Sequence, residues 1–155
     1  MDGDGRSIRD GRHSLIVAGP AVVEWAARRT NDRGEWGLAV GIGQERDGTL
    51  EAAAVYNGWN GADLCIHLVV EGRLSRASVT ECLWRYPFVQ VGARRLSAYI
   101  AAANDRCRRL AVHAGFRWEA TLKGAHRTGD LMIYVLTPDR AQRTVKRYAE
   151  SVTTH

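Results

Sequence analysis

The stretch RRLSAYIAAANDRCRRLAVHAGFRWEATLKGAHRTGDLMIY, Arg94–Tyr134, contains the clearest succession of secondary-structure patterns in the chain. Leu96–Ala103 is an apolar run with several small residues and no proline, which predicts a buried strand. The residues that follow place apolar or small side chains at the spacing of one helix face, at Cys107, Leu110, Ala111 and Ala114. The stretch therefore predicts a strand followed directly by a helix.

The predicted helix has suitable residues at both ends. Asn104 or Asp105 is a natural N-cap, because a short side-chain oxygen there accepts a hydrogen bond from an amide of the first turn. Gly115 suits the left-handed residue after a helix, and Phe116 can then fold back onto the helix. A second strand follows. A turn is then predicted at Thr128–Gly129, and a third strand over Leu131–Thr137.

The rest of the chain alternates between strand and helix patterns. Strands are predicted at Ser14–Ala18, Glu35–Gln44, Thr49–Tyr56 and Ala62–Val70. Helices are predicted from Pro20 onward, over Ser78–Gly92 with a break near Pro87, and over Asp139–Val152. The predicted order is β-α-β-β-β-α-β-α-β-β with an added C-terminal helix, which is typical of a mixed α/β protein.

Composition indicates one globular domain. The chain has 155 residues, of which 45% are hydrophobic and 25% charged, and these fractions are ordinary for a single core. No apolar run approaches the roughly 20 residues of a membrane span, and the N-terminus does not look like a signal peptide, so a cytoplasmic protein without a membrane partner is expected. The odd number of widely spaced cysteines predicts buried thiols, with neither disulfides nor a metal site, at Cys65, Cys82 and Cys107.

The net charge of +5 comes mainly from arginine. Such a charge suits nucleic acid, an acidic partner or an anionic cofactor, and it equally suits a solvated basic surface. A nucleic-acid binder would need its basic residues gathered on one face, which the sequence does not show.

In its order and spacing, the stretch resembles the C-terminal half of the GNAT superfamily of acetyl-CoA-dependent N-acetyltransferases. It is most similar to the branch related to the N-terminal acetyltransferases of ribosomal proteins, including short members common in phage genomes. The residues that carry the resemblance are Asn104, Cys107, Leu110, Gly115, Phe116, Glu119, Leu122, Lys123, Gly129, Asp130 and Tyr134. The resemblance is clear over residues 62–137, and upstream only the order of elements fits.

The resemblance implies a single-domain GNAT-like mixed β-sheet flanked by helices on both faces. This domain would cover residues 14–137. The glycine-rich and charged residues 1–13 are expected to form a flexible N-terminal arm. Residues 138–155 are expected to form a basic C-terminal helix and tail.

The resemblance also implies that acetyl-CoA is the acyl donor. In the family, its pyrophosphate lies on backbone amides at a helix N-terminus, and its pantetheine arm lies between two splayed strands. The family loop reads Arg/Gln-x-x-Gly-x-Gly/Ala, whereas the best register here, Arg73–Ser78, lacks both loop glycines. The cofactor-binding residues implied are Arg73, Ser75, Arg76, Ala77, Ser78 and Asn104.

The implied reaction transfers an acyl group to an amine and needs a base that works near neutral pH. His67 is the candidate by residue type, and Glu71 at the end of the same strand could act through water. Cys107 sits where the family often has serine or alanine, near the thioester, and Ala111 replaces a general-acid tyrosine of many relatives. The plain alternatives are a histidine without a catalytic role and, for Asn104, a simple N-cap.

Two functions remain open at this point. The first is N-acetyl transfer from acetyl-CoA to an amine acceptor, which is a protein or a small molecule. The second is a catalytically inactive GNAT-like structural or interaction protein, with protein partners in a phage particle or another assembly and therefore a virion location. The basic tail, the charged arm and the absent loop glycines favour the second function.

Overall fold

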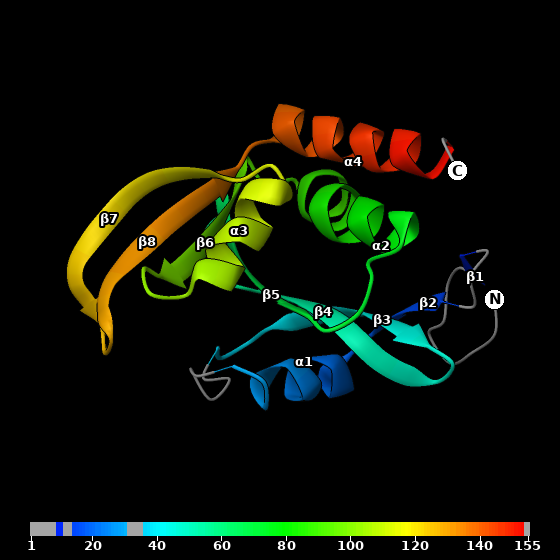
Figure 1. The fold of residues 1–155 in the computed structure, drawn as a ribbon, viewed down its shortest axis with the longest axis horizontal. Coiled ribbons are helices and arrows are strands. Elements are labelled where there is room, and N and C mark those ends of the chain that lie inside the picture. The colour runs from blue at the N-terminus through cyan, green and yellow to red at the C-terminus, as the bar shows by residue number, and fades with distance from the viewer. Residues whose placement is uncertain (1–8, 11–13, 31–35, 154–155) are drawn as a thin grey trace.

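The computed structural model describes residues 9–10, 14–30 and 36–153 of the chain. In these residues, eight strands form one mixed sheet in the order β1-β2-β3-β4-β5-β6-β8-β7 (Figure 1). The strands are β1 Arg9–Asp10, β2 Ser14–Ala18, β3 Val40–Arg46, β4 Thr49–Asn57, β5 Asp63–Val70, β6 Arg95–Ala101, β7 Arg117–His126 and β8 Gly129–Leu136. The helices are α1 Pro20–Ala27, α2 Arg76–Thr80, the π-helix η1 Glu81–Gln90, α3 Asp105–His113 and α4 Pro138–Thr153.

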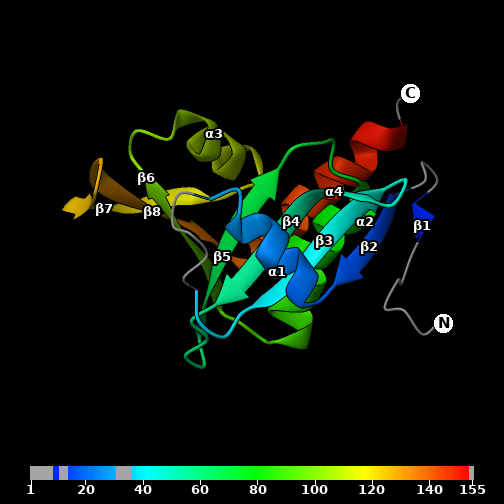
Figure 2. The same ribbon diagram turned by 90° about the horizontal axis from the view of Figure 1, so that it is seen from below.

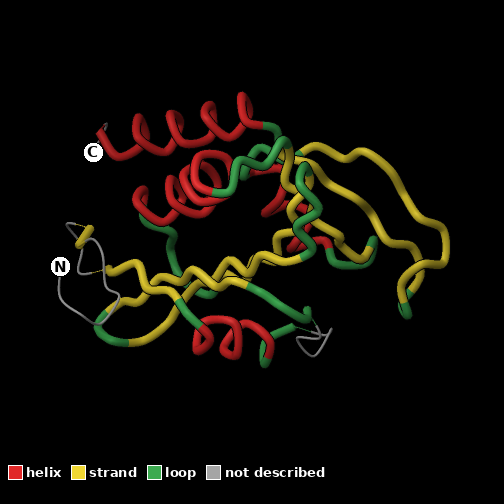
Figure 3. The backbone as a smooth tube through the Cα atoms, turned by 180° about the vertical axis from the view of Figure 1, so that it is seen from behind, coloured by secondary structure: helices red, strands yellow, loops and turns green. Residues whose placement is uncertain are grey.

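Helices cover both faces of the sheet, as predicted. The view from below shows α1 lying across β3 and β4 (Figure 2). The tube view shows α2, η1, α3 and α4 gathered on the opposite face (Figure 3). Two hydrophobic clusters correspond to these layers: the larger lies under α2, η1, α3 and α4, and the smaller lies under α1. The fold class predicted from the sequence is therefore confirmed.

The ends of α3 follow the predicted capping chemistry. The Asn104 side chain accepts a hydrogen bond from the Cys107 amide at 3.1 Å and is the N-cap. Gly115 has φ +99°, in the left-handed region. The Phe116 amide returns to the Ala111 carbonyl at 2.9 Å, which closes the helix as a Schellman motif and buries the Phe116 ring.

The predicted first residue of β3 is wrong. The alternation that begins at Trp36 suggested a strand from Glu35, but β3 begins at Val40. Gly37 adopts φ +65°, which turns the chain out of an extended conformation. Trp36 is consequently buried in the smaller cluster, while Leu38 is 99% exposed. The apparent strand periodicity comes from a turn at Gly37 that buries Trp36 and exposes Leu38.

The break predicted near Pro87 is also wrong. Pro87 lies inside η1, and the chain stays helical to Gln90. The hydrogen bond that closes this segment runs from the Val91 amide to the Tyr86 carbonyl, a spacing of five residues. Proline has no amide to donate and its ring collides with the carbonyl four residues earlier in an α-helix. The wider π-helix therefore accommodates a residue that would otherwise kink the helix.

The C-terminal segment forms the predicted helix and is fastened to the end of α3. Arg140 donates to the Gly115 carbonyl at 3.0 Å, and the buried Thr144 hydroxyl donates to the Ala114 carbonyl at 2.8 Å. Arg147 donates to the His113 carbonyl. Three successive carbonyls at the C-terminal end of α3 thus find donors on α4, two of them cationic, which suits the negative end of a helix dipole. The flexible arm predicted for residues 1–13 lies outside the described residues, except for the strand β1.

Candidate active site

The central feature of the site is the divergence of two parallel strands. β5 and β6 pair only from Asp63 with Arg95 to Cys65 with Ser97, and beyond these pairs β5 loses its neighbour on that side. The carbonyl of Val70 instead accepts a hydrogen bond from Arg106 of α3 at 3.1 Å. The gap between the two strands is therefore bridged at its far end by a cationic side chain.

Beyond Cys65, the edge of β5 that faces this gap pairs with no described strand. Alternate residues of a strand direct their amide and carbonyl groups to the same side. Because the Val70 carbonyl points toward α3, the Leu68 peptide groups and the Ile66 carbonyl point into the same gap, while the Ile66 amide belongs to the last pair with β6. An extended chain with amide groups can therefore add to β5 there as an extra strand.

The loop after β5 is held by a buried glutamine of β3. Gln44 is 1% exposed, accepts a hydrogen bond from the Ser75 amide at 2.8 Å and donates to the Arg73 carbonyl at 2.8 Å. Ser75 is the N-cap of α2, and its hydroxyl oxygen accepts from the Ser78 amide at 3.0 Å. The amides of Ser75 and Ser78 are thus bonded to protein atoms.

The first two residues of the same loop are also bonded internally. The amides of Glu71 and Gly72 both donate to the Glu51 carbonyl, at 2.8 and 3.1 Å. A Cβ on Gly72 would lie 2.3 Å from the Glu51 carboxylate, so this glycine permits the approach of Glu51. The glycine in the loop therefore serves contact within the protein, whereas the family glycines allow approach to phosphates.

The predicted cofactor residues divide into buried and exposed groups. Ser75 and Ser78 are buried and Ala77 packs against the core. Arg73 lies in the loop and Arg76 is the first residue of α2, both exposed, and Arg106 lies at the far end of the gap. Asn104 is exposed, and its side-chain oxygen serves as the helix cap. Arg106 was not identified from the sequence, because only the packing of α3 on β5 brings it there.

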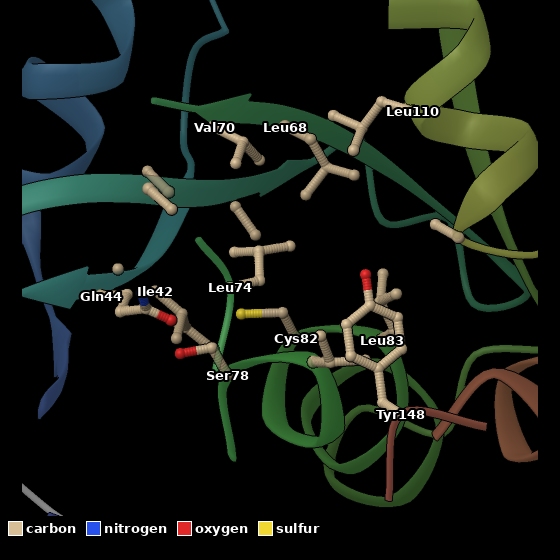
Figure 4. Close-up of a pocket in the computed structure, with 16 residues that line it drawn as sticks. Ile42, Gln44, Leu68, Val70, Leu74, Ser78, Cys82, Leu83, Leu110 and Tyr148 are labelled. Atoms are coloured by element: carbon tan, nitrogen blue, oxygen red, sulfur yellow. The ribbon is translucent and has the colours of Figure 1, made fainter. Parts of the chain in front are cut away.

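A small apolar cavity lies behind the gap, with a volume of about 30 Å³ (Figure 4). Its walls come from the sheet, from α2 and η1, from α3 and from α4. Leu74 reaches it from the loop, and Tyr148 extends into it from α4 (Figure 4). The C-terminal helix therefore contributes directly to the region between α2 and α3.

His67 lies just past the point where the strands separate. It pairs with Val55 of β4, two positions after the last residue of β5 that pairs with β6. Its Nε2 lies 2.9 Å from the Asn57 Oδ1. The indole of Trp36 stacks on its ring with a centroid distance of 4.7 Å and an angle of 23° between the planes. The predicted base thus sits at the divergence, on the α1 face of the sheet.

The structure separates Glu71 from His67. Four residues of extended chain span roughly 13 Å, and the Glu71 carboxylate pairs with Arg29 at 2.6 Å. Arg29 in turn lies over the Trp25 ring, 4.0 Å from its centroid. Glu71 therefore links the end of β5 to α1 and does not join His67 in one constellation.

Cys107 lies in the first turn of α3 and is partly buried. Burial raises the pKa of its thiol, so the sulfur stays protonated at neutral pH. The other two cysteines, Cys65 and Cys82, are free thiols as well. Among the described residues, no group of three or more His, Cys, Asp or Glu side chains is arranged to hold a metal ion. None of the described helices is long and apolar enough to cross a bilayer.

A polar network on the α1 face was not identified from the sequence. Arg95 donates to both carboxylate oxygens of Glu119, at 2.9 and 2.7 Å, and to the buried Ser97 hydroxyl. Ser97 donates to the Asp63 carboxylate at 2.6 Å. Tyr99 lies on the same face and is 44% exposed. The signal was present, since polar residues alternate with Leu96, Ala98 and Ile100 along β6.

The hydrogen bond from Arg95 holds the pKa of the Glu119 carboxyl below its ordinary value. The Glu119 carboxylate therefore stays charged at neutral pH. The network lies where β5 and β6 are still paired, at the base of the gap. It gives this part of the open sheet face a fixed arrangement of two carboxylates around one guanidinium.

Comparison with solved structures shows which fold this is. A chimera of Vibrio cholerae spermidine N-acetyltransferase SpeG and hSSAT superposes with a TM-score of 0.65 and 10% identity, over 84% of this chain and 99% of that one. A GCN5-related N-acetyltransferase from Brucella melitensis gives a TM-score of 0.68 and 15% identity, over 96% of this chain and 89% of that one. No family model and no curated protein sequence matches the chain. The chain has the GNAT fold.

Proposed function

We propose that the protein is an N-acyltransferase that moves the acetyl group of acetyl-CoA to an amine. The observation that carries this proposal is the divergence of β5 and β6, with the strand edge of β5 open and His67 beside it. A pantetheine arm carries two amides and can hydrogen-bond to the Ile66 carbonyl and to Leu68 as an added strand. The GNAT fold of the similar structures supports the same reading.

Cationic side chains suit the phosphates of the donor. Arg73 and Arg76 are exposed at the start of α2, and Arg106 closes the far end of the gap. Because the Ser75 and Ser78 amides are bonded within the protein, guanidinium groups take the larger share of the phosphate contacts. Asn104 and the small side chain of Ala77 line the approach from α3 and α2 in this proposal.

His67 serves as the base in the proposed reaction. The amine nitrogen forms a bond to the acetyl carbon, the carbon–sulfur bond breaks, and the sulfur leaves with the electron pair and takes up a proton. The proton lost by the amine passes to His67. Cys107 contributes an uncharged thiol near the thioester, and Glu71 acts only through intervening water.

The proposal also ranks three classes of amine acceptor. The resemblance of the sequence to ribosomal-protein N-terminal acetyltransferases makes a protein N-terminus the first acceptor class to screen. Spermidine, the acceptor named for the Vibrio cholerae neighbour, is the second class, and a lysine side chain is the third. All three are amines and need the same removal of a proton.

Titration calorimetry with acetyl-CoA tests the donor site. We expect micromolar binding by the parent and a loss of about tenfold or more in an Arg73→Ala/Arg76→Ala variant, because a hydrogen bond to a charged group contributes ~1.5–3 kcal/mol. Arg143→Ala/Lys146→Ala on the exposed side of α4 is the matched control and should bind like the parent. Absence of both heat and thermal stabilisation at millimolar acetyl-CoA would overturn the proposal, since a hundredfold excess over Kd stabilises by ~2.7 kcal/mol.

A second candidate is a GNAT-fold protein without catalysis, used in an assembly such as a phage particle. The observation that favours it is the internal bonding of the Glu71, Gly72, Ser75 and Ser78 amides. This candidate predicts no response to acetyl-CoA and a defined oligomer or complex in sedimentation. Saturable acetyl-CoA binding together with amine-dependent release of CoA would exclude it.

A further inference from the structure

Asn57 and Trp36 are neighbours of the His67 ring on the α1 face and hold it. Asn57 ends β4, and the antiparallel register pairs it with Cys65, so that it lies diagonally across from His67 on the same face. Trp36 is 9% exposed and stacks on the imidazole. The contact with Asn57 therefore fixes the ring at Nε2, and the stacked Trp36 indole covers one face of the imidazole.

The orientation of the Asn57 amide is decided by a second hydrogen bond. Its Nδ2 donates to the Trp36 carbonyl at 3.0 Å, and a carbonyl can only accept. The Asn57 Oδ1 must then be the atom that faces His67, at 2.9 Å from Nε2. Because an amide oxygen also only accepts, Nε2 carries a hydrogen and donates it.

This assignment determines which ring nitrogen exchanges a proton. Nε2 keeps its hydrogen in the neutral and in the charged imidazole. Protonation and deprotonation therefore take place at Nδ1. The Trp36 indole face also attracts the imidazolium that forms when the histidine accepts a proton.

We propose that Asn57 and Trp36 are positioning residues that present His67 as the base of acetyl transfer, with Nδ1 as the proton-accepting atom. This inference rests on the proposed function. The amine proton passes to Nδ1, the charged ring remains bonded to the Asn57 Oδ1 through Nε2, and release of the proton restores the neutral Nε2–H form. The sequence offers no local sign of this arrangement, because Asn57 stands in an NGWNG segment typical of a turn.

The first test measures the tautomer in the protein alone by nitrogen NMR of the imidazole rings. His67→Gln assigns the signals. We expect the parent His67 in the Nε2–H form, and Asn57→Ala to shift it toward a mixture of tautomers. Asn57→Asp keeps an accepting oxygen and should keep the Nε2–H form. Thr128→Ala is the matched control: it removes the hydroxyl 2.8 Å from the His126 Nδ1 and should alter only the His126 signals.

The second test compares kinetics of the same variants. Asn57→Ala should lower kcat by about tenfold to a hundredfold, part of the 10²–10⁴ that a general base supplies. The KM for acetyl-CoA should stay within about twofold, because Asn57 lies on the face opposite the proposed phosphate contacts. Asn57→Asp should recover most of the lost kcat, and Trp36→Phe, which keeps a stacked ring, should lose less than Trp36→Ala.

The outcomes separate this inference from the proposed function. An active parent with His67 in the Nδ1–H form, or an Asn57→Ala variant with unchanged tautomer and kcat, would overturn the positioning role alone. A parent that neither binds acetyl-CoA nor transfers acetyl groups would overturn the proposed function and the catalytic part of this inference together. The tautomer result would still show whether Asn57 orients the ring.

Discussion

Gln44 and Ser75 are joined by a 2.8 Å hydrogen bond across 31 positions of sequence, and this contact fixes where α2 begins. The amide oxygen of Gln44 accepts from the Ser75 amide while its nitrogen donates to the Arg73 carbonyl and to the Glu51 carboxylate. A single buried side chain therefore satisfies three polar groups from two other segments. The loop that faces the proposed phosphates is shaped by β3 as much as by its own residues.

Replacing this glutamine should destabilise the protein measurably. Gln44→Leu would leave the buried Ser75 amide without its partner and the Arg73 carbonyl with only the 3.4 Å contact from Arg46. An unsatisfied buried polar group costs about 1–3 kcal/mol of unfolding free energy. Urea denaturation measures the change. Gln142→Leu, on the exposed side of α4, is the control and should stay within about 0.5 kcal/mol. Equal midpoints for the two variants would show that the Gln44 contacts contribute nothing.

Gly115→Ala should destabilise the protein for two separable reasons. Its φ of +99° strains any other residue, and an added Cβ would lie 2.4 Å from the Thr144 hydroxyl. Gly124→Ala is the matched control, because Gly124 has φ +64° with nothing within 4 Å of the added Cβ. We expect Gly115→Ala to lose at least about 1 kcal/mol more than the control, in the range of overpacked sites.

The collision can be tested by a double substitution. Thr144→Ala removes the hydroxyl, so the cost of Gly115→Ala should be smaller in that background than in the parent. Additive costs would show that strain at Gly115 acts alone and that α4 yields to the added methyl group.

The Arg95–Glu119 pair predicts a pH dependence of stability. The pKa of Glu119 is lowered from its ordinary 4.5, chiefly by the hydrogen bond from Arg95. A depressed folded-state pKa contributes stability above the unfolded-state value, and this contribution disappears as pH falls through the folded-state value. The stability difference between the parent and Glu119→Gln should therefore be constant from pH 7 to 6 and vanish on acidification below the ordinary value.

Chemical denaturation at several pH values measures this difference. Asp47→Asn replaces an exposed carboxylate in the turn between β3 and β4 and serves as the reference. A Glu119→Gln difference that grows on acidification would contradict the assigned direction of the pKa change.

The thiols should be poorly reactive in the folded protein. Burial raises the pKa of Cys82 to about 12, and it also raises the pKa of Cys107. Because the thiolate is the reactive form, labelling by iodoacetamide at pH 8 should be slow at both residues and fast after unfolding in urea. Rapid labelling of Cys107 in the native state would instead indicate a thiolate, which could act as a nucleophile.

Much of the fold could be predicted because its signals are local. The caps of α3 depend on Asn104 and Gly115 alone, and both were predicted correctly. The π-helix around Pro87 was missed, because its wider turn is stabilised by packing against the sheet and α4, which no local pattern records. The start of β3 was misplaced because Trp36 belongs to a turn that only resembles an alternating strand.

The candidate site was less predictable because register and packing assemble it. His67 was found by residue type, but its partners Asn57 and Trp36 depend on the pairing of β4 with β5 and on the turn at Gly37. Arg106 and Gln44 reach the gap and its loop from elements distant in sequence. The roles assigned to these residues remain predictions for the experiments above.

The attachment of α4 to α3 has a consequence for biosynthesis. Among the described residues, the carbonyls of His113, Ala114 and Gly115 accept side-chain hydrogen bonds from the 16-residue helix α4, which is translated after the other described elements. Until then, the end of α3 and the apolar side of η1 are open to water and to chaperones. A nascent chain that stops before Pro138 would keep these groups exposed, and quality-control proteases should recognise it. The packing around the end of α3 is thus completed only once α4 has been made.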